Sequence, residues 1–456
     1  MILQWYSEFD ASQTVWQLIA ALLLLLTLLP GLALLLNSDR DSIVLYPGPS
    51  AILQGALLLT AGWLLLIFTL TFGPSAGTMP DDTEGEALAP QSMQEMMRAA
   101  ATNKDQRPWM GRGGLVGNID FLLMGHFESQ GNSEAPLFAA RRPWTRIPLS
   151  ILSVFQLCIF LTAAAATVVA VQTRIPQPMT QLLFVFTWGC FVYAPAVHWT
   201  WGEGWLGIRN VMDNGGSVLM LICVGTTYGI RLLPAITLDV DGQAVSAPQL
   251  RVPRPIAQLL FIVGLLPLAS SLGVHSIPVR AITVLNLLAG GSGGLLSLVI
   301  LRGLAPGRCT STAIQDGFLW GLLLTLASSS LVSPVTALVC GCSGTVVMII
   351  IAEASLTLCA CFKTPLFRLT VCLLIGMLFP GLLGTSATGV QNWDGSLIQS
   401  MIHGSSELLL WQCVAAVCVL IWSALVTYAL LRLTRIIAKP QDAPSRVRVL
   451  TEQTTL

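Results

Sequence analysis

Long apolar runs, separated by shorter polar segments, are repeated along almost the whole chain. Each run is close to the roughly 20 residues that an α-helix needs to cross the hydrocarbon core of a bilayer. The pattern therefore predicts an all-α polytopic membrane protein with eleven transmembrane helices. These helices are expected over residues 13–36, 50–73, 146–171, 179–200, 212–233, 255–275, 279–302, 312–332, 334–356, 366–388 and 405–436.

One long hydrophilic stretch interrupts the pattern. It follows Pro74, which cannot continue a helix, and it is rich in polar residues, proline and glycine. Together with the polar C-terminal tail, this stretch divides the chain into four parts. We expect the first two transmembrane helices in residues 1–74, a hydrophilic outer loop with an insertion in 75–146, the remaining nine helices in 147–437, and a short cytoplasmic tail in 438–456.

The composition agrees with this class of protein. Hydrophobic residues make up 54% of the chain and charged residues only 10%, which excludes a water-soluble globule. The formal net charge is zero and the charges are scattered, so nothing indicates a nucleic-acid partner. The lipid bilayer is the partner that the composition predicts.

The basic residues predict the orientation in the membrane. The first of them is Arg40, so the opening segment lacks the positive start of a signal peptide. If the N-terminus lies outside, the short outer loops hold only Arg209 and Arg280, and most other arginines and lysines fall on the inner side. We expect an integral protein of the plasma (inner) membrane with an outer N-terminus and a cytoplasmic C-terminus.

The cysteines give no indication of a metal site. Cys340 and Cys342, like Cys359 and Cys361, are two residues apart in apolar helices. Residues two apart on a helix point to different faces and cannot share a ligand, so small packing residues are the better interpretation. We predict no metal and no cofactor. We find no nucleophile–base pair in the sequence that would indicate an enzyme.

Polar, aromatic and glycine residues are concentrated in three successive predicted helices. They are Phe155-Gln156, then the segment from Tyr193 to Gly202, which includes Pro195, His198 and Trp201, and then Asp213-Asn-Gly-Gly-Ser-Val-Leu-Met220. Such residues are costly at membrane depth unless they face a cavity or a neighbouring helix. Three such helices in a row predict a lined pathway.

These motifs, in this order, resemble those of the ammonium transporter (Amt/Rh) family, which reads FQ, then Y-x-P-x-A-H-x-x-W-G, then D-F-A-G-G-T-V-V-H. The resemblance implies the Amt-type fold, with inverted five-helix repeats and an eleventh helix. It also implies a homotrimer with one pore per protomer, and ammonium or ammonia as substrate. The tail lacks the family's acidic, glycine-containing segment, so docking of a PII-type regulator is not implied.

The resemblance assigns roles to individual positions. It places Trp201 and Ser276 at the outer vestibule, and Asp213 as support for the cation site, although a belt tryptophan and a simple helix cap explain Trp201 and Asp213 as well. The gate phenylalanines of the family fall on Ile159, with Phe160 beside it, and on Leu272. The two pore histidines fall on Met220 and Met377.

These residues are compatible with three functions. A thioether has no proton to give and is a weak acceptor, so methionine removes the proton relay of the family. The first hypothesis is a channel or transporter that passes ammonium or ammonia through this degenerate pore. The second is a non-conducting sensor, scaffold or partner subunit. The third is permeation of another small neutral or soft species, for which Met220, Met377 and Cys372 supply soft ligands.

Overall fold

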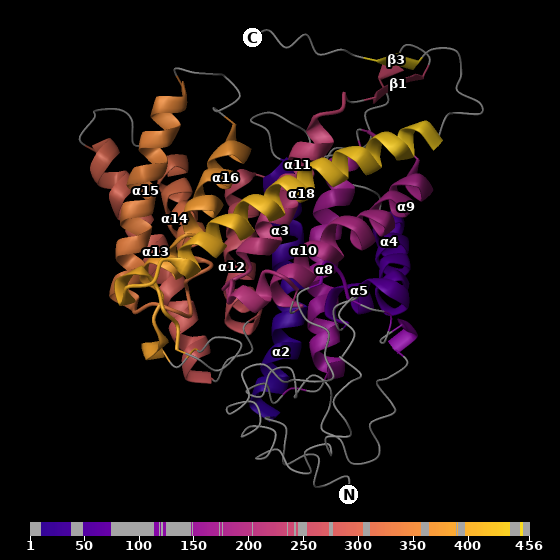
Figure 1. Ribbon diagram of the computed structural model, residues 1–456. Helices are drawn as coiled ribbons and strands as arrows, with labels where there is room; N and C mark the ends of the chain where they lie inside the picture. Colours follow the sequence, from indigo (N-terminus) through magenta and orange to yellow (C-terminus); the bar gives the residue numbers. More distant parts are fainter. Residues whose placement is uncertain are drawn as a thin grey trace, which may run out of the picture.

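The computed structural model describes most of the predicted helices. The described residues are 11–37, 49–73, 114–117, 119, 122–124, 147, 149–172, 174–175, 177–202, 204–234, 236–240, 243–244, 253–272, 277–303, 311–356, 364–388, 390, 397–437 and 447–449. Within them the fold is helical apart from three short strands (Figure 1). The predicted all-α membrane class is confirmed.

The first half of the chain supplies five of the predicted spans. Three of them contain a π turn, which is written η. The spans are α2 (Ala11–Leu23), η1 (Leu24–Leu28) and α3 (Leu29–Asn37); α4 (Pro49–Gly62), η2 (Trp63–Ile67) and α5 (Phe68–Phe72); α8 (Leu149–Val171); α9 (Pro178–Trp188), η5 (Gly189–Tyr193) and α10 (Ala194–Trp201); and α11 (Ser217–Arg231).

The second half supplies the other six. They are α12 (Arg254–Leu272), α13 (Ile277–Gly303), α14 (Ser311–Thr325), α15 (Pro334–Leu356), the broken pair α16 (Pro365–Gly376) and α17 (Phe379–Leu383), and α18 (Glu407–Ile437). Short 3₁₀ turns occur at η3 (Leu122–Met124), η6 (Gly207–Arg209), η8 (Ser386–Thr388) and η9 (Met401–His403). Nine segments of the described residues, with α16 and α17 counted together as one, are long and apolar enough to cross a membrane, and α11 and α14 are shorter.

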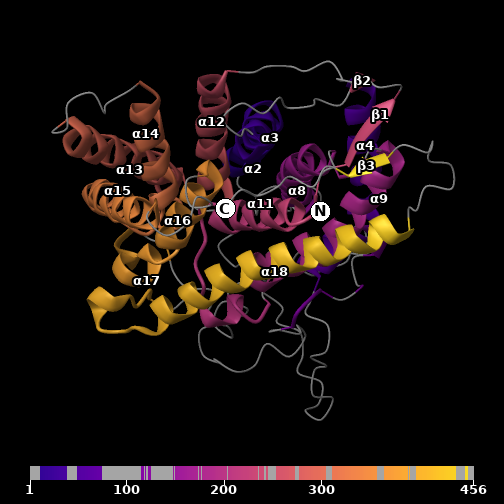
Figure 2. The ribbon, with the colours of Figure 1, turned by 90° about the horizontal axis from the view of Figure 1, so that it is seen from above.

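The helices form one bundle that a last helix crosses obliquely. Helices α13, α14 and α15 gather on one side of the bundle and α4 and α9 on the other (Figure 1). Seen from above, α18 runs along one edge of the bundle from α17 to α9 (Figure 2), and it packs most extensively against α11. Helix α18 therefore contacts both halves of the chain.

Small residues permit the closest helix contacts. A Cβ atom added at Gly341 of α15 would overlap the carbonyl oxygen of Gly290 in α13, and one added at Gly321 of α14 would overlap the same oxygen. Backbones approach this closely only where side chains are absent or small. The contact packs α14 and α15 tightly onto α13.

Span eight ends earlier than predicted. Its helix stops at Thr325, and residues 326–332 form turns. The Ser328 hydroxyl donates to the carbonyl of Thr325 (3.3 Å) and the Ser329 hydroxyl to that of Leu326 (2.8 Å). Serine hydroxyls that bond to nearby carbonyls compete with helix bonds, which explains the early end. The Asn286 amide then donates to the released carbonyl of Ser329 (2.6 Å).

A small antiparallel sheet lies outside the bundle. Strand β1 (Ile236–Val240) pairs on one side with β2 (Gln243–Ala244) and on the other with β3 (Val447–Val449). The register places Ile236 opposite Val449. The sequence pattern predicts none of these strands. The sheet brings part of the C-terminal segment beside the connection between α11 and α12.

Candidate functional site

The start of α11 is fixed by one carboxylate. Asp213 is 5% exposed, and it accepts hydrogen bonds from the backbone amides of Gly216 (3.0 Å), Ser217 (2.8 Å) and Val218 (2.8 Å). Gly216 takes a left-handed conformation with φ of +95°, which suits glycine. The carboxylate thus binds amides that the first helical turn leaves without partners. This geometry is that of a helix cap.

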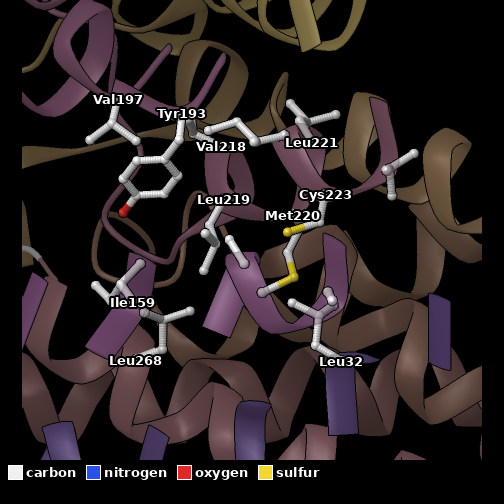
Figure 3. Packing of buried hydrophobic residues seen from close by; sticks show 14 of the residues in the cluster. Leu32, Ile159, Tyr193, Val197, Val218, Leu219, Met220, Leu221, Cys223 and Leu268 are labelled. Carbon is white, nitrogen blue, oxygen red and sulfur yellow. The ribbon is translucent and has the colours of Figure 1, made fainter. Parts of the chain in front are cut away.

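Met220 lies in the first turn of α11 and faces the core. It is 1% exposed and belongs to the large buried cluster that also contains Leu32 of α3, Ile159 of α8 and Leu268 of α12 (Figure 3). Four separate helices therefore meet near this side chain. The surroundings are apolar, and Figure 3 shows the sulfur of Cys223 beside Met220, so two polarisable sulfur atoms lie close together there.

Met377, where the resemblance places the second pore histidine, lies in the second half of the chain. It is fully buried and lies directly after α16, at the break before α17. Its amide bonds to the carbonyl of Leu373 (3.0 Å). Both methionines thus lie at an end of a short helix, one in the first turn of α11 and one after the last turn of α16. Neither position carries a group that can transfer a proton.

Ile159 and Phe160 point to different neighbours. The Phe160 ring stacks on Trp63 (centroids 5.5 Å apart, planes at 24°) and meets Tyr193 edge-on at 5.1 Å. It therefore belongs to an aromatic cluster between α8 and the two π turns η2 and η5. Figure 3 shows Ile159 beside Leu268, in the cluster that contains Met220. Ile159 and Phe160 thus pack against different neighbours, and the gate assignment stays a prediction.

Leu268 is a residue of this region that sequence reasoning missed. It lies one turn before Leu272 on α12, so both leucines share a face of that helix. Leu272 is also buried, at the last residue of the helix. The side chain of Leu268 packs directly on Gly216 at the start of α11. The spacing of four residues between Leu268 and Leu272 was the signal in the sequence that could have identified Leu268.

Trp201 lies at the last residue of α10 and is buried, with 6% of its surface exposed. Ser276, the other predicted vestibule residue, lies outside the described residues. Nearby tryptophans form a chain of ring contacts: Trp199 to Trp205 (5.9 Å) and to Trp422 (5.1 Å), and Trp205 to Trp411 (6.5 Å). These rings join α10 and the following loop to α18.

His198 in the motif before Trp201 has a structural contact. Its Nδ1 lies 3.0 Å from the carbonyl oxygen of Thr71, and the side chain is fully buried. The ring thus ties α10 to α5. Among the residues that the structure describes, no three His, Cys, Asp or Glu side chains group as a metal site, and the eight described cysteines are free.

A polar cluster joins the starts of α12, α14 and α16. Asp316 accepts hydrogen bonds from Arg254 (2.9 Å) and from the Gln258 amide (2.8 Å). The guanidinium of Arg368 lies 5.9 Å from the centroid of the Trp320 ring, a cation–π distance. Sequence analysis did not single out Asp316. A carboxylate inside the predicted span 312–332 was the available signal.

Comparison with known proteins identifies the family. The sequence matches the Ammonium Transporter Family over residues 114–234 and 265–442, which is more than half of the chain. The chain belongs to the ammonium transporter family. This ammonium transporter family member is therefore an integral membrane protein of a transporter class and not an enzyme.

Individual relatives agree with the assignment. The family member is similar to a putative ammonium transporter of Methanothermobacter thermautotrophicus, with 26% identity over 330 residues, 70% of this chain and 76% of the relative. It is also similar to an ammonium transporter of Aquifex aeolicus, with 21% identity over 443 residues, 93% of this chain and 88% of the relative.

Solved structures show the same fold. The crystal structure of Candida albicans Mep2 superposes with a TM-score of 0.69 at 18% identity, covering 95% of this chain and 86% of that one. A structure described as a sensor Amt protein gives a TM-score of 0.62 at 16% identity, covering 93% of both chains. The Amt-type fold that the motifs imply is confirmed.

Proposed function

We propose that this family member passes ammonia in its neutral form through an apolar pathway within each protomer. The observation that carries the proposal is the pair of buried thioethers, Met220 and Met377, at the positions where the family resemblance expects histidines. An imidazole titrates near neutrality and both donates and accepts a proton. A thioether does neither, so a charge relay through these two positions is absent.

The remaining assigned residues then have supporting roles. Asp213 holds the first turn of α11, and thereby Met220, in place. Trp201 and Ser276 are proposed to contact the ammonium ion at the outer vestibule, where an aromatic face attracts a cation. Ile159 and Leu268 form the apolar constriction in place of aromatic gates (Figure 3). Leu272 lies one helical turn after Leu268, towards the proposed vestibule.

The assembly and its orientation are part of the proposal. We infer a homotrimer with one pathway per protomer in the plasma membrane, with the N-terminus outside and the C-terminus in the cytoplasm. The distribution of arginines and lysines and the odd number of spans support this orientation. No PII-type regulator is proposed as a partner.

Transport by the reconstituted protein tests the proposal. Proteoliposomes with an internal pH-sensitive dye are given an inward ammonia gradient, and charge movement is recorded separately on a solid-supported membrane. We expect internal alkalinisation faster than in empty vesicles, without an ammonium-evoked current. In the variant with both Met220→His and Met377→His, we expect a current to appear.

Two variants control for ammonia that crosses the lipid itself. Leu268→Trp enlarges a fully buried side chain at the constriction and should return the alkalinisation rate to that of empty vesicles. Leu285→Trp makes the same change at an exposed position of α13 and should leave the rate unchanged. A current in the unaltered protein, or equal rates in both variants, would contradict neutral conduction through this constriction.

A non-conducting sensor, scaffold or partner subunit is the second candidate. The full burial of Ile159, Leu268 and Met377 favours it, because packed side chains leave less room for a substrate. The likeness in fold to a protein described as a sensor Amt protein adds to this. Alkalinisation no faster than in empty vesicles, with ammonium binding still measurable by calorimetry, would support this second candidate.

A further inference from the structure

Two sulfur-containing side chains lie side by side on α11. Met220 and Cys223 are three residues apart, a spacing that makes side chains neighbours on the surface of a helix. Figure 3 shows the sulfur of Cys223 beside Met220, within the buried cluster. Both residues are buried, and the Cys223 thiol forms no disulfide. A thioether and a thiol are therefore neighbours inside the bundle.

Helix α16 packs against α11 and runs antiparallel to it. A Cβ atom added at Gly215, just before α11, would overlap the carbonyl oxygen of Leu326. One added at Gly376, the last residue of α16, would overlap the carbonyl oxygens of Leu323 and Leu324. The start of α11 and the end of α16 therefore lie beside the same short segment at the end of α14.

The antiparallel packing places Met377 at the height of Met220. The hydroxyl groups of Tyr228 in α11 and Thr370 in α16 are 3.1 Å apart, so these two residues share one level. Met220 comes eight residues before Tyr228, and Met377 comes seven residues after Thr370. With a rise of about 1.5 Å per residue, both methionines lie about 10 to 12 Å from that level, in the same direction.

Met377 also lies on the side of α16 that faces α11. It keeps a helical conformation, with φ of −66°, and it is fully buried. Seven residues make almost two full turns, so Met377 and Thr370 are on the same face. Cys372 is only two residues from Thr370 and points to a different face. Met220, Cys223 and Met377 are called the sulfur cluster below.

We propose that the sulfur cluster binds one soft monovalent metal cation of the copper(I) class. Thiolate and thioether sulfur are the ligands that select copper(I) over harder metals. On binding, the Cys223 thiol releases its proton to the solvent and bonds to the metal as a thiolate. The two methionines bind as neutral ligands. The metal keeps its oxidation state throughout.

Charge balance favours a monovalent ion at this place. One thiolate and one monovalent cation form a neutral pair, which an apolar core holds at lower cost than a charged group. A divalent ion would leave one positive charge uncancelled by these three ligands. Zinc(II) also takes thiolate, imidazole and carboxylate ligands in proteins. The sulfur cluster therefore fits copper(I) and not zinc(II).

Packing is the simpler role for the same three residues. Methionine and cysteine fill apolar cores without binding any ligand. Leucine has a volume close to that of methionine but carries no sulfur. An exchange of methionine for leucine therefore preserves the packing and removes a ligand, which separates the two roles. Metal binding is measured without transport, so its outcome does not depend on ammonia conduction.

Copper(I) competition with the purified full-length protein in detergent tests the proposal. The coloured copper(I) complex of bathocuproine disulfonate is titrated with protein under anaerobic conditions, and the loss of colour counts the ions that the protein takes up. We expect one ion per protomer. Met220→Leu and Met377→Leu should each weaken binding about 10-fold. Cys223→Ala should abolish it, because the cluster then has no thiolate.

Matched controls make the same exchanges elsewhere in the core. Met348 and Cys340 are buried in α15, and Met348→Leu and Cys340→Ala should leave copper(I) binding unchanged. Zinc(II) in excess should not displace copper(I) from the unaltered protein. Melting temperatures without metal show whether each variant folds. If Met220→Leu fails to fold, Met377→Leu carries the test.

Three results would overturn the proposal. A protein that takes no copper(I) from the chelator has no such site. Unchanged affinity in both Met220→Leu and Met377→Leu would leave packing as the role of the methionines. Equal losses in Cys340→Ala and Cys223→Ala would show that copper(I) binds to scattered thiols and not to the sulfur cluster.

Discussion

At the scale of single residues, the contribution of Asp213 to stability can be tested directly. Its two carboxylate oxygens satisfy three backbone amides at the start of α11. Asp213→Ala leaves these buried donors without an acceptor, and we expect a loss of about 2 kcal/mol in the free energy of unfolding. Asp213→Asn keeps one acceptor oxygen and should lose less. Unfolding in mixed micelles measures both, and equal losses would indicate that charge alone matters.

Gly215 lies where two backbones touch. A Cβ atom there would overlap the carbonyl oxygen of Leu326. This oxygen is a backbone atom, so it cannot rotate away as the end of a side chain could. We expect Gly215→Ala to cost about 3 kcal/mol or more, as overpacking of a rigid site does, and to lower the yield of folded protein. In the matched Gly207→Ala, the added Cβ lies 3.4 Å from the nearest atom, an ordinary contact. Similar melting temperatures for the two variants would contradict the explanation.

Residue roles were only partly predictable from the sequence. Asp213 was recognisable because a carboxylate before an apolar helix has few other uses than capping. Leu268 was not recognisable. Moving the alignment of α12 with the family motif by one helical turn replaces Leu272 by Leu268, and the sequence alone does not distinguish the two leucines. Phe160 and Ile159 are adjacent, so the sequence alone left open which one faces the constriction. The contacts of Phe160 with Trp63 and Tyr193 show where its ring packs, and the gate assignment stays a prediction.

At the scale of helices, buried hydrogen bonds join α9, α11 and α18. The Trp188 indole donates to the Thr226 hydroxyl (3.0 Å), and the Thr427 hydroxyl lies 3.5 Å from the same oxygen. We expect Trp188→Phe and Thr226→Val to be coupled by about 1 kcal/mol in a double-mutant cycle, as measured for bonds between membrane helices. Trp422→Phe combined with Thr226→Val is the control pair, because the Trp422 indole donates to the Phe191 carbonyl instead. Equal coupling in both cycles would contradict this assignment.

Helix positions followed from apolar length, but helix interruptions did not. Each predicted span contains a helix because each buries or exposes to lipid a long apolar run. The π turns at Leu24–Leu28, Trp63–Ile67 and Gly189–Tyr193 leave no mark in that pattern. At the third of them, Gly189 lies directly against the side chains of Ile67 and Phe160, a contact between distant segments that the pattern does not show. The break after Thr325 had a local signal in three consecutive serines.

At the scale of the whole molecule, the small sheet links segments more than 200 residues apart. We expect that ending the chain after Ile437, which removes β3, leaves the melting temperature of the bundle unchanged. Cleavage by a protease in the connection between α11 and α12 should become faster, because β1 loses the hydrogen bonds from β3. Limited proteolysis followed by mass spectrometry measures this. Unchanged cleavage would show that the pairing of β1 with β3 gives no protection.

The overall architecture was predictable and the sheet was not. The order of the motifs along the chain implied the Amt-type fold, because one family has that order. Pairing between β1 and β3 depends on two distant segments meeting, and neither segment has a long alternating pattern. The roles of the pathway residues depend on which side chains face one another across helices, which a single sequence does not specify.

The course of α18 has a mechanical consequence. One continuous helix of 31 residues touches α17 at one end, α11 in the middle and α9 towards the other end. Many transporters work by rocking one half against the other. Here such rocking requires α18 to slide over close contacts, where Gly225 and Gly229 of α11 lie against its backbone. Helix α18 therefore opposes such rocking. On the proposed function this favours a passage of constant width, in which discrimination depends on the side chains that line it and not on the timing of a large movement.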